Sequence, residues 1–89
     1  MLQIVRTKHF KKDIKKISMT DTQYQKFIIY LSTLLNGDPL PPEALDHPLQ
    51  GEWKDTREFH LGGDLLVIYR IEDNQLQLIR IGTHSQLFK

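Results

Sequence analysis

Apolar residues recur at helical spacing in the first half of the chain and at strand spacing in the second half. A short strand is predicted at residues 2–5, and the Thr7 hydroxyl can cap a helix that follows it. Within that helix Phe10, Ile14 and Ile17 recur on one face, whereas lysines occupy most of the other sides. The chain is therefore predicted to begin with a strand and a basic amphipathic helix.

A second helix is predicted to begin near Thr20 or Asp21 and to end at Asn36 and Gly37, residue types that favour helix termination. Its apolar positions keep helical spacing throughout: Tyr24, Phe27, Ile28, Leu31, Leu34 and Leu35. All four prolines of the chain fall in the next stretch, residues 37–51. Because proline fixes φ and lacks an N–H donor, this stretch is predicted to be an ordered surface loop.

The rest of the chain is rich in β-branched, aromatic and leucine residues separated by short turn signals. Three strands are predicted, at residues 53–61, 65–72 and 75–82. The middle strand is apolar on both faces and should be central, and Gly62-Gly63 and Asp73-Asn74 suit tight turns. The sequence predicts one domain, residues 1–89, of the α+β class: two helices packed on a mainly antiparallel four-stranded sheet, in the order strand-helix-helix-strand-strand-strand.

Composition narrows the class of protein. The 89 residues include no Cys, which excludes disulfides, thiolate metal sites and cysteine nucleophiles. The first residues lack the apolar stretch of a signal peptide, and no apolar run is long enough to cross a bilayer. We therefore expect a cytoplasmic protein without a membrane partner. The net charge is only +1, which permits an anionic partner without requiring one.

Four side chains with acid-base chemistry fall at breaks or strand ends: His47, His60, Asp64 and His84. In an antiparallel meander the last strand ends level with the Gly62-Gly63 turn, so His60, Asp64 and His84 can converge there. Convergent imidazoles and a carboxylate are typical of acid-base catalysis near neutral pH. Two other interpretations stay open: histidines that form surface hydrogen bonds only, and a zinc site with the same four ligands. No H-x-x-x-H pair supports a metal, so no metal or other cofactor is expected.

The second half carries three stretches that together are specific: "DHPLQGEWKDTREFHL", "LLVIYRI" and "RIGTHSQLF". In this order, through residues 46–88, they resemble the YafQ branch of the RelE-like bacterial toxins, the messenger RNA interferases of toxin–antitoxin pairs. The strand-helix-helix-meander order predicted above agrees with the fold of that family.

The resemblance implies an endoribonuclease that enters the ribosomal A site and cuts the messenger there. It implies two partners, the ribosome with translated mRNA and an antitoxin of the DinJ type, and no direct DNA binding by the toxin alone. The functional residues of that branch match His47, His60, Asp64 and His84, and Phe88 corresponds to the terminal aromatic near the RNA base. The alternative is a non-catalytic module of the same fold that binds the ribosome or a partner.

RNA cleavage by its own 2′-hydroxyl needs a base for that hydroxyl, an acid for the departing 5′ oxygen, and positive charge near the phosphate. We expect His84 to act as the general acid and Asp64 or His60 as the base. His47 would position the substrate or stabilise charge.

Other residues are candidates for RNA binding. Arg80 lies shortly before His84 on the last predicted strand and can hold a phosphate bidentately. Phe88 can stack on an unpaired base or anchor the C-terminus in the core. The lysines of the first helix either contact RNA phosphates or form a solvated face, and three are candidates: Lys11, Lys12 and Lys15.

Overall fold

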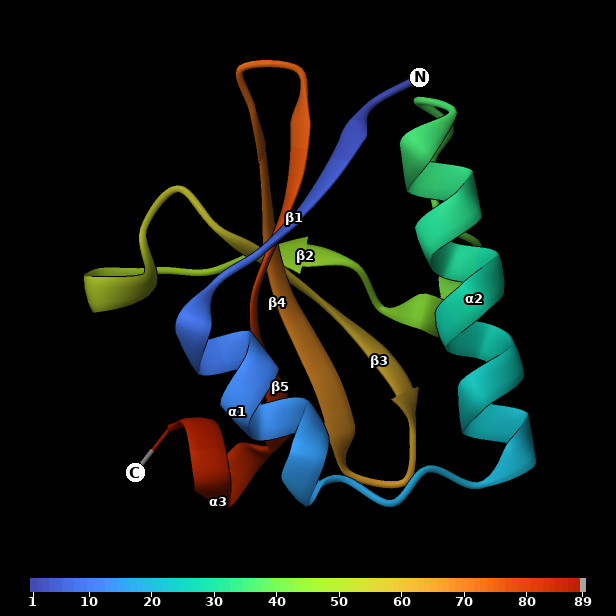
Figure 1. The fold of residues 1–89 in the computed structure, drawn as a ribbon, viewed down its shortest axis with the longest axis vertical. Helices are drawn as coiled ribbons and strands as arrows, with labels where there is room; N and C mark the ends of the chain where they lie inside the picture. Colours follow the sequence, from blue (N-terminus) through green and yellow to red (C-terminus); the bar gives the residue numbers. More distant parts are fainter. Residues whose placement is uncertain (89) are drawn as a thin grey trace.

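The computed structural model describes residues 1–88 and shows a mixed five-stranded sheet in the order β1-β5-β4-β3-β2 (Figure 1). The strands are β1 (Gln3–Arg6), β2 (His47–Pro48), β3 (Arg57–Gly62), β4 (Leu65–Glu72) and β5 (Gln75–Thr83). β1 is parallel to β5, and the other neighbours are antiparallel. The predicted α+β class is confirmed. The sheet has one strand more than predicted because His47 and Pro48, in the proline-rich loop, pair with β3.

Two helices cover one face of the sheet, α1 (Lys8–Lys16) and α2 (Asp21–Leu35) (Figure 1). Both begin at the predicted caps, because the Thr7 and Thr20 hydroxyls accept backbone N–H groups at 3.0 and 3.1 Å. A short third helix, α3 (His84–Leu87), and two 3-10 turns (Pro42–Ala44 and Gly51–Trp53) were not among the predicted elements. Among residues 1–88, no helix has the length and apolarity needed to span a membrane.

The central strand β4 separates two hydrophobic clusters, as its apolar pattern predicts. Leu65, Val67 and Tyr69 face α1 and α2 and belong to the larger cluster. Leu66 and Ile68 face the other way and pack with Leu87, Trp53 and Phe88, among others. The second face is thus only partly covered, by α3 and the loop that precedes β3, and its uncovered part is available for a site.

The two turns of the meander have the backbone that their residues predict. Gly62 and Gly63 have φ of 101° and 61°, and Asp73 and Asn74 have φ of 53° and 62°. Such positive values suit Gly, Asn and Asp. Because these turns lie at opposite ends of β4, the start of α3 after β5 returns to the end where β3 turns into β4.

Candidate active site

The alternation of side chains along β3 brings a carboxylate and an imidazole to the partly covered face. Glu58 pairs with Ile68 and His60 with Leu66, so both project on the side away from α1 and α2. β2 adds the next side chain, because His47 pairs with Glu58 across the β2–β3 ladder. Three side chains from two neighbouring strands, β2 and β3, thereby meet at one patch of the sheet.

Glu58 lies beneath the two imidazoles. Its side chain is only 3% exposed, and its two oxygens lie 3.7 Å from His47 Nε2 and 3.1 Å from His60 Nε2. Within residues 1–88, Glu58 Oε2 is buried and has no contact with the geometry of a hydrogen bond. A buried carboxylate oxygen without a hydrogen bond is energetically costly, so Glu58 is a candidate to interact with a cationic group.

His84 stands at the start of α3, where the Thr83–Gln86 capping box fixes the end of β5. Its Nδ1 lies 3.3 Å from Asp64 Oδ1, and both side chains are more than half exposed. The ring centroid of His84 is 6.1 Å from that of His60 and 5.4 Å from that of Phe88. The structure therefore brings His60, Asp64 and His84 to the same end of the sheet.

His47 extends this row of rings, with its centroid 6.1 Å from that of His60. Its Nδ1 lies 2.7 Å from the carbonyl oxygen of Leu45. Since a carbonyl oxygen can only accept, this contact places a proton on Nδ1 and leaves Nε2 facing Glu58. The row from His47 through His60 and His84 to Phe88 is the candidate active site.

The sequence pattern of the family described as bacterial toxin of type II toxin-antitoxin system, YafQ, matches residues 2–89. The chain belongs to this family.

Relatives cover nearly the whole chain. The mRNA interferase toxin YafQ of Escherichia coli K12 is 42% identical over 81 residues, which are 89% of this chain and 87% of that protein. The crystal structure of a metal-bound toxin from Helicobacter pylori has 41% identity and a TM-score of 0.85, and the match covers 99% of this chain and 100% of that one. The toxin-like chain of the E. coli DinJ-YafQ complex has 34% identity and a TM-score of 0.84 over 100% of both chains.

Arg80, the arginine expected at phosphate, is engaged within the protein. Its Nε and Nη2 donate to the two oxygens of Asp13 on α1 at 2.7 and 3.0 Å, and the backbone N–H of Ile81 donates to Asp13 at 3.2 Å. The hydrogen bond and charge of Asp13 raise the pKa of Arg80. Burial raises the pKa of Asp13, but Arg80 and the Ile81 N–H outweigh burial and lower it overall. The side chain of Arg80 still lines an open groove of about 650 Å³ with Trp53 and Phe88.

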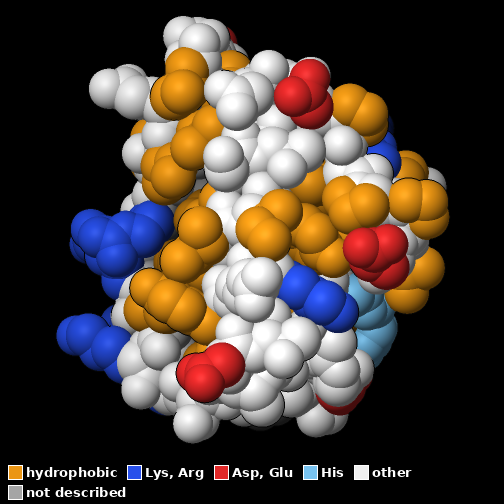
Figure 2. All heavy atoms as spheres, turned by 90° about the vertical axis from the view of Figure 1, so that its right-hand side faces the viewer, with side chains coloured by type: hydrophobic (Ala, Val, Ile, Leu, Met, Phe, Trp, Pro, Cys, Tyr) orange, Lys and Arg blue, Asp and Glu red, His pale blue; other side chains and the backbone are white. Residues whose placement is uncertain are grey.

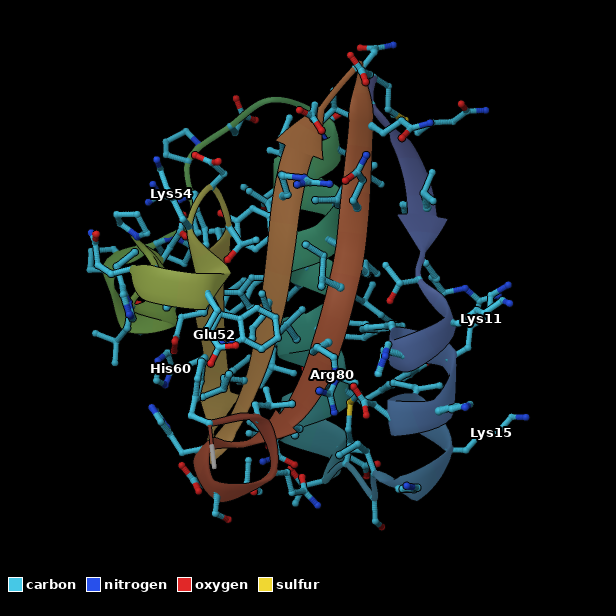
Figure 3. All side chains as sticks on the ribbon, turned by 90° about the vertical axis from the view of Figure 1, so that its left-hand side faces the viewer. Lys11, Lys15, Glu52, Lys54, His60 and Arg80 are labelled. Atoms are coloured by element: carbon cyan, nitrogen blue, oxygen red, sulfur yellow. The ribbon has the colours of Figure 1, made fainter. Side chains whose placement is uncertain are left out.

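The lysines of α1 lie away from the histidines. Figure 3 shows Lys11 and Lys15 pointing into solvent from α1, with Arg80 between them and His60. Lys12 is exposed on the same helix. The two other meander arginines bind acidic partners: Arg57 lies 3.1 Å from Asp46 and Arg70 lies 3.5 Å from Glu72. Basic side chains therefore form a surface next to the site rather than a part of it.

Glu58 was not among the residues that the sequence predicted for the site. The signal was present in the alternation of β3, because a residue two positions before His60 shares its face. The residues that could hold a metal ion also differ from the four that the sequence suggested. Among residues 1–88, the cluster of close ligand atoms comprises His47, Glu58 and His60, with ligand atoms within 4.8 Å of one another. Asp64 and His84 are not part of it.

Proposed function

We propose that this chain is an endoribonuclease that cleaves messenger RNA through attack of the RNA 2′-hydroxyl. One observation carries the proposal: three imidazoles and two carboxylates, from β2, β3, the β3–β4 turn and α3, converge beside Phe88. The activity of the E. coli relative, named an mRNA interferase, supports it. DNA lacks the 2′-hydroxyl and should not be cleaved.

The chemistry requires two proton transfers. The 2′ oxygen forms a bond to phosphorus as a base takes its proton, and the 5′ oxygen leaves with a proton from an acid. We assign the acid to His84, which is exposed and can reach a bound phosphate, with Asp64 orienting its ring through Nδ1. This arrangement leaves Nε2 of His84 as the proton donor.

His60 is the proposed base. Its Nε2 contacts the buried carboxylate of Glu58 at 3.1 Å, so its Nδ1 is the nitrogen that remains for the substrate. The Glu58 carboxylate stabilises the imidazolium that forms when His60 takes the proton, as a buried carboxylate does in other acid-base pairs. Glu58 also contacts His47 at 3.7 Å, and the positive charge of a protonated His47 would stabilise the transition-state phosphate.

Substrate binding is proposed to use the groove beside Phe88. The aromatic rings of Phe88 and Trp53 lie 5.9 Å apart at 75°, so each steadies the other while one Phe88 face stays next to His84. Stacking of an unpaired base there is worth about 1–3 kcal/mol. Arg80 lines the same groove and can meet a phosphate at its exposed edge.

The ribosome is the proposed source of alignment. A net charge of +1 gives little long-range attraction to free RNA, so binding has to use local basic surfaces. Lys11, Lys12 and Lys15 lie on α1, from which they can contact ribosomal RNA while the histidines face the messenger (Figure 3). Positioning by the ribosome then supplies what a small open site lacks.

A DinJ-like antitoxin is the proposed restraint between periods of activity, since the related E. coli toxin was crystallised with DinJ. The helix layer offers an apolar surface for such a partner. Figure 2 shows apolar side chains along the outer side of α2, where Tyr24, Ile28 and Ile29 are about half exposed. An amphipathic antitoxin segment with acidic residues suits this surface and the adjacent lysines of α1.

Primer extension tests the proposed function. Purified protein is added to one messenger, either free or during translation, at matched physiological salt. We expect cleavage within codons of the translated messenger and little cleavage of free RNA, with His84→Ala as the control for contaminating ribonuclease. Equal cleavage of both would contradict ribosome dependence. Ribosome binding without any cleavage would favour the non-catalytic module.

Metal binding is a second candidate property, favoured by the close ligand atoms of His47, Glu58 and His60 and by the unbonded Glu58 oxygen. Two imidazoles and a carboxylate suit zinc or copper, and a structural relative from H. pylori is metal-bound. The same lone pairs serve the proposed reaction, so we expect added zinc to inhibit cleavage and a chelator to leave it intact. Loss of activity on chelation, restored by zinc, would instead make the metal part of the reaction.

A further inference from the structure

Asp46, the residue before His47, connects the proline-rich loop to the sheet. Its Oδ1 accepts hydrogen bonds from Tyr69 Oη at 2.8 Å and from Arg57 Nε at 3.1 Å. Tyr69 lies on the central strand β4 and Arg57 on β3, so one carboxylate oxygen joins the loop to two strands. The side chain of Asp46 is 19% exposed and Tyr69 is buried, so solvent competition is low for the bond between them.

The ring of Tyr69, and not its hydroxyl, accounts for the packing of this residue in the core. The residue is 1% exposed and its ring packs in the cluster between sheet and helices, 5.6 Å from the ring of Phe59. A phenylalanine would fill the same space. Burial raises the pKa of Tyr69 and the Asp46 carboxylate raises it further, so the hydroxyl remains a donor to Asp46.

His47 depends on the backbone on either side of Asp46. On the N-terminal side, Leu45 has φ of 52°, a left-handed conformation that is unfavourable for leucine, and its carbonyl holds His47 Nδ1. On the C-terminal side, Pro48 pairs with Arg57, the second donor to Asp46. If Asp46 moved, the left-handed turn at Leu45 would move with it. The Leu45 carbonyl would then no longer hold the His47 ring in its orientation.

We propose that Asp46 and Tyr69 are positioning residues for His47: their hydrogen bond holds the loop so that the His47 ring keeps its Nδ1 proton on Leu45 and its Nε2 toward Glu58. The residues act from the opposite face of the sheet, where Tyr69 belongs to the helix-side core. The inference rests on the proposed function for the role of His47, but the geometry that it assigns to that ring can be tested without cleavage.

The test uses Tyr69→Phe, which removes one oxygen and keeps the buried ring. Tyr30→Phe is the matched control. Tyr30 is also buried and packs on Phe59, but the tyrosine hydroxyl that binds Asp46 is that of Tyr69. Nitrogen-15 NMR of the imidazoles gives the tautomer of His47. We expect Tyr69→Phe to reduce the population protonated at Nδ1 and Tyr30→Phe to leave it unchanged.

Cleavage of translated messenger supplies the second measurement. Tyr69→Phe should lower kcat about tenfold with a smaller change in KM, which is less than the roughly 10²-fold that a 1 Å misplacement at a catalytic site can cost. In a His47→Ala background the same substitution should have no further effect, because its action passes through that ring. The non-additivity distinguishes positioning from a general loss of stability, which would lower activity in both backgrounds.

Asp46→Ala provides a second variant in case the tyrosine change disturbs the core, and it should reproduce the tautomer change and the loss in kcat. Asp46→Asn keeps an acceptor for the Tyr69 hydroxyl, so it should retain most of the wild-type His47 tautomer population and most of the wild-type kcat. An unchanged His47 tautomer in both Tyr69→Phe and Asp46→Ala, or a full additional loss in the His47→Ala background, would overturn the proposal. A wild-type protein that cleaves nothing would refute the proposed function while the NMR comparison still decides the positioning.

Discussion

Asp13 and Asp64 each contact a basic side chain from the β5–α3 segment, but at different depths and with different geometry. Asp13 holds Arg80 with two hydrogen bonds of 2.7 and 3.0 Å, and the two side chains are 13% and 23% exposed. Asp64 meets His84 at one distance of 3.3 Å, and the two side chains are 61% and 55% exposed. Both pairs lie near the end of the same strand.

The difference follows from what each pair is able to do. A partly buried bidentate pair with an arginine, which does not lose its proton, fixes α1 against the edge of β5. An exposed single contact leaves the histidine ring accessible to a bound phosphate, and imidazole is the side-chain type used most often for proton transfer. The first pair therefore stabilises the fold, and the second is suited to proton transfer.

The largest expected effect on activity comes from removing the histidine of the Asp64–His84 pair. His84→Ala should lower cleavage of translated messenger about 10²–10⁴-fold, the usual contribution of a positioned acid. The melting temperature should stay within about 2 °C of the wild type, since exposed pairs contribute little to stability. His9→Ala, an exposed histidine on α1, is the matched control and should retain activity. Near wild-type cleavage by His84→Ala would remove this residue from the mechanism.

Breaking the Asp13–Arg80 pair should instead mainly lower the stability of the fold. Asp13→Asn removes the charge that Arg80 binds while keeping side-chain volume, and we expect a loss of about 1–3 kcal/mol in the free energy of unfolding. For a chain of this size each 1 kcal/mol lowers the melting temperature by about 4–8 °C. Urea unfolding measures it, with Asp38→Asn, an exposed loop carboxylate, as control. A stability equal to that of the control would show that the pair contributes nothing to the fold.

The two pairs also show what sequence reasoning reaches. Turn chemistry and alternation in the meander placed Asp64 and His84 at one end of the sheet, because local rules fix strand register there. The Asp13–Arg80 pair joins residues 67 positions apart, and no periodicity specifies which edge of β5 the first helix covers. Arg80 was expected at the RNA because it lies shortly before His84 on the last predicted strand, and its pairing with Asp13 was not foreseen.

The same limit applies to the site. The helices α1 and α2 with their caps, the central strand and both hairpin turns were predictable, since each depends on a few neighbouring residues. The pairing of His47 with Glu58 depends on the fold of the whole proline-rich loop, which proline content alone predicts only as ordered. Glu58 was missed because its burial follows from that loop and the His47 ring that cover it.

A smaller effect should appear when pH changes. Because the pKa of Asp13 is lower in the folded than in the unfolded protein, its contribution to stability is fully present above the ordinary value of 3.8 and is lost as pH falls through the folded value. The stability difference between wild type and Asp13→Asn should therefore shrink as pH falls below about pH 4. Urea titrations at stepped pH measure this difference. A difference that grows as pH falls below about pH 4 would reverse the assigned sign.

The smallest expected change in stability comes from Asp64→Asn. Its carboxylate is exposed and makes a single contact of 3.3 Å, so the free energy of unfolding should change by less than about 1 kcal/mol. Cleavage should fall, but less than in His84→Ala, because the acid itself remains and loses only the group that orients its ring. Asp73→Asn, at the other turn of the meander, removes the same charge far from the site and is the control for both measurements. If Asp64→Asn destabilised the protein as much as Asp13→Asn, the exposed pair would have a structural role and the contrast between the two aspartates would fail.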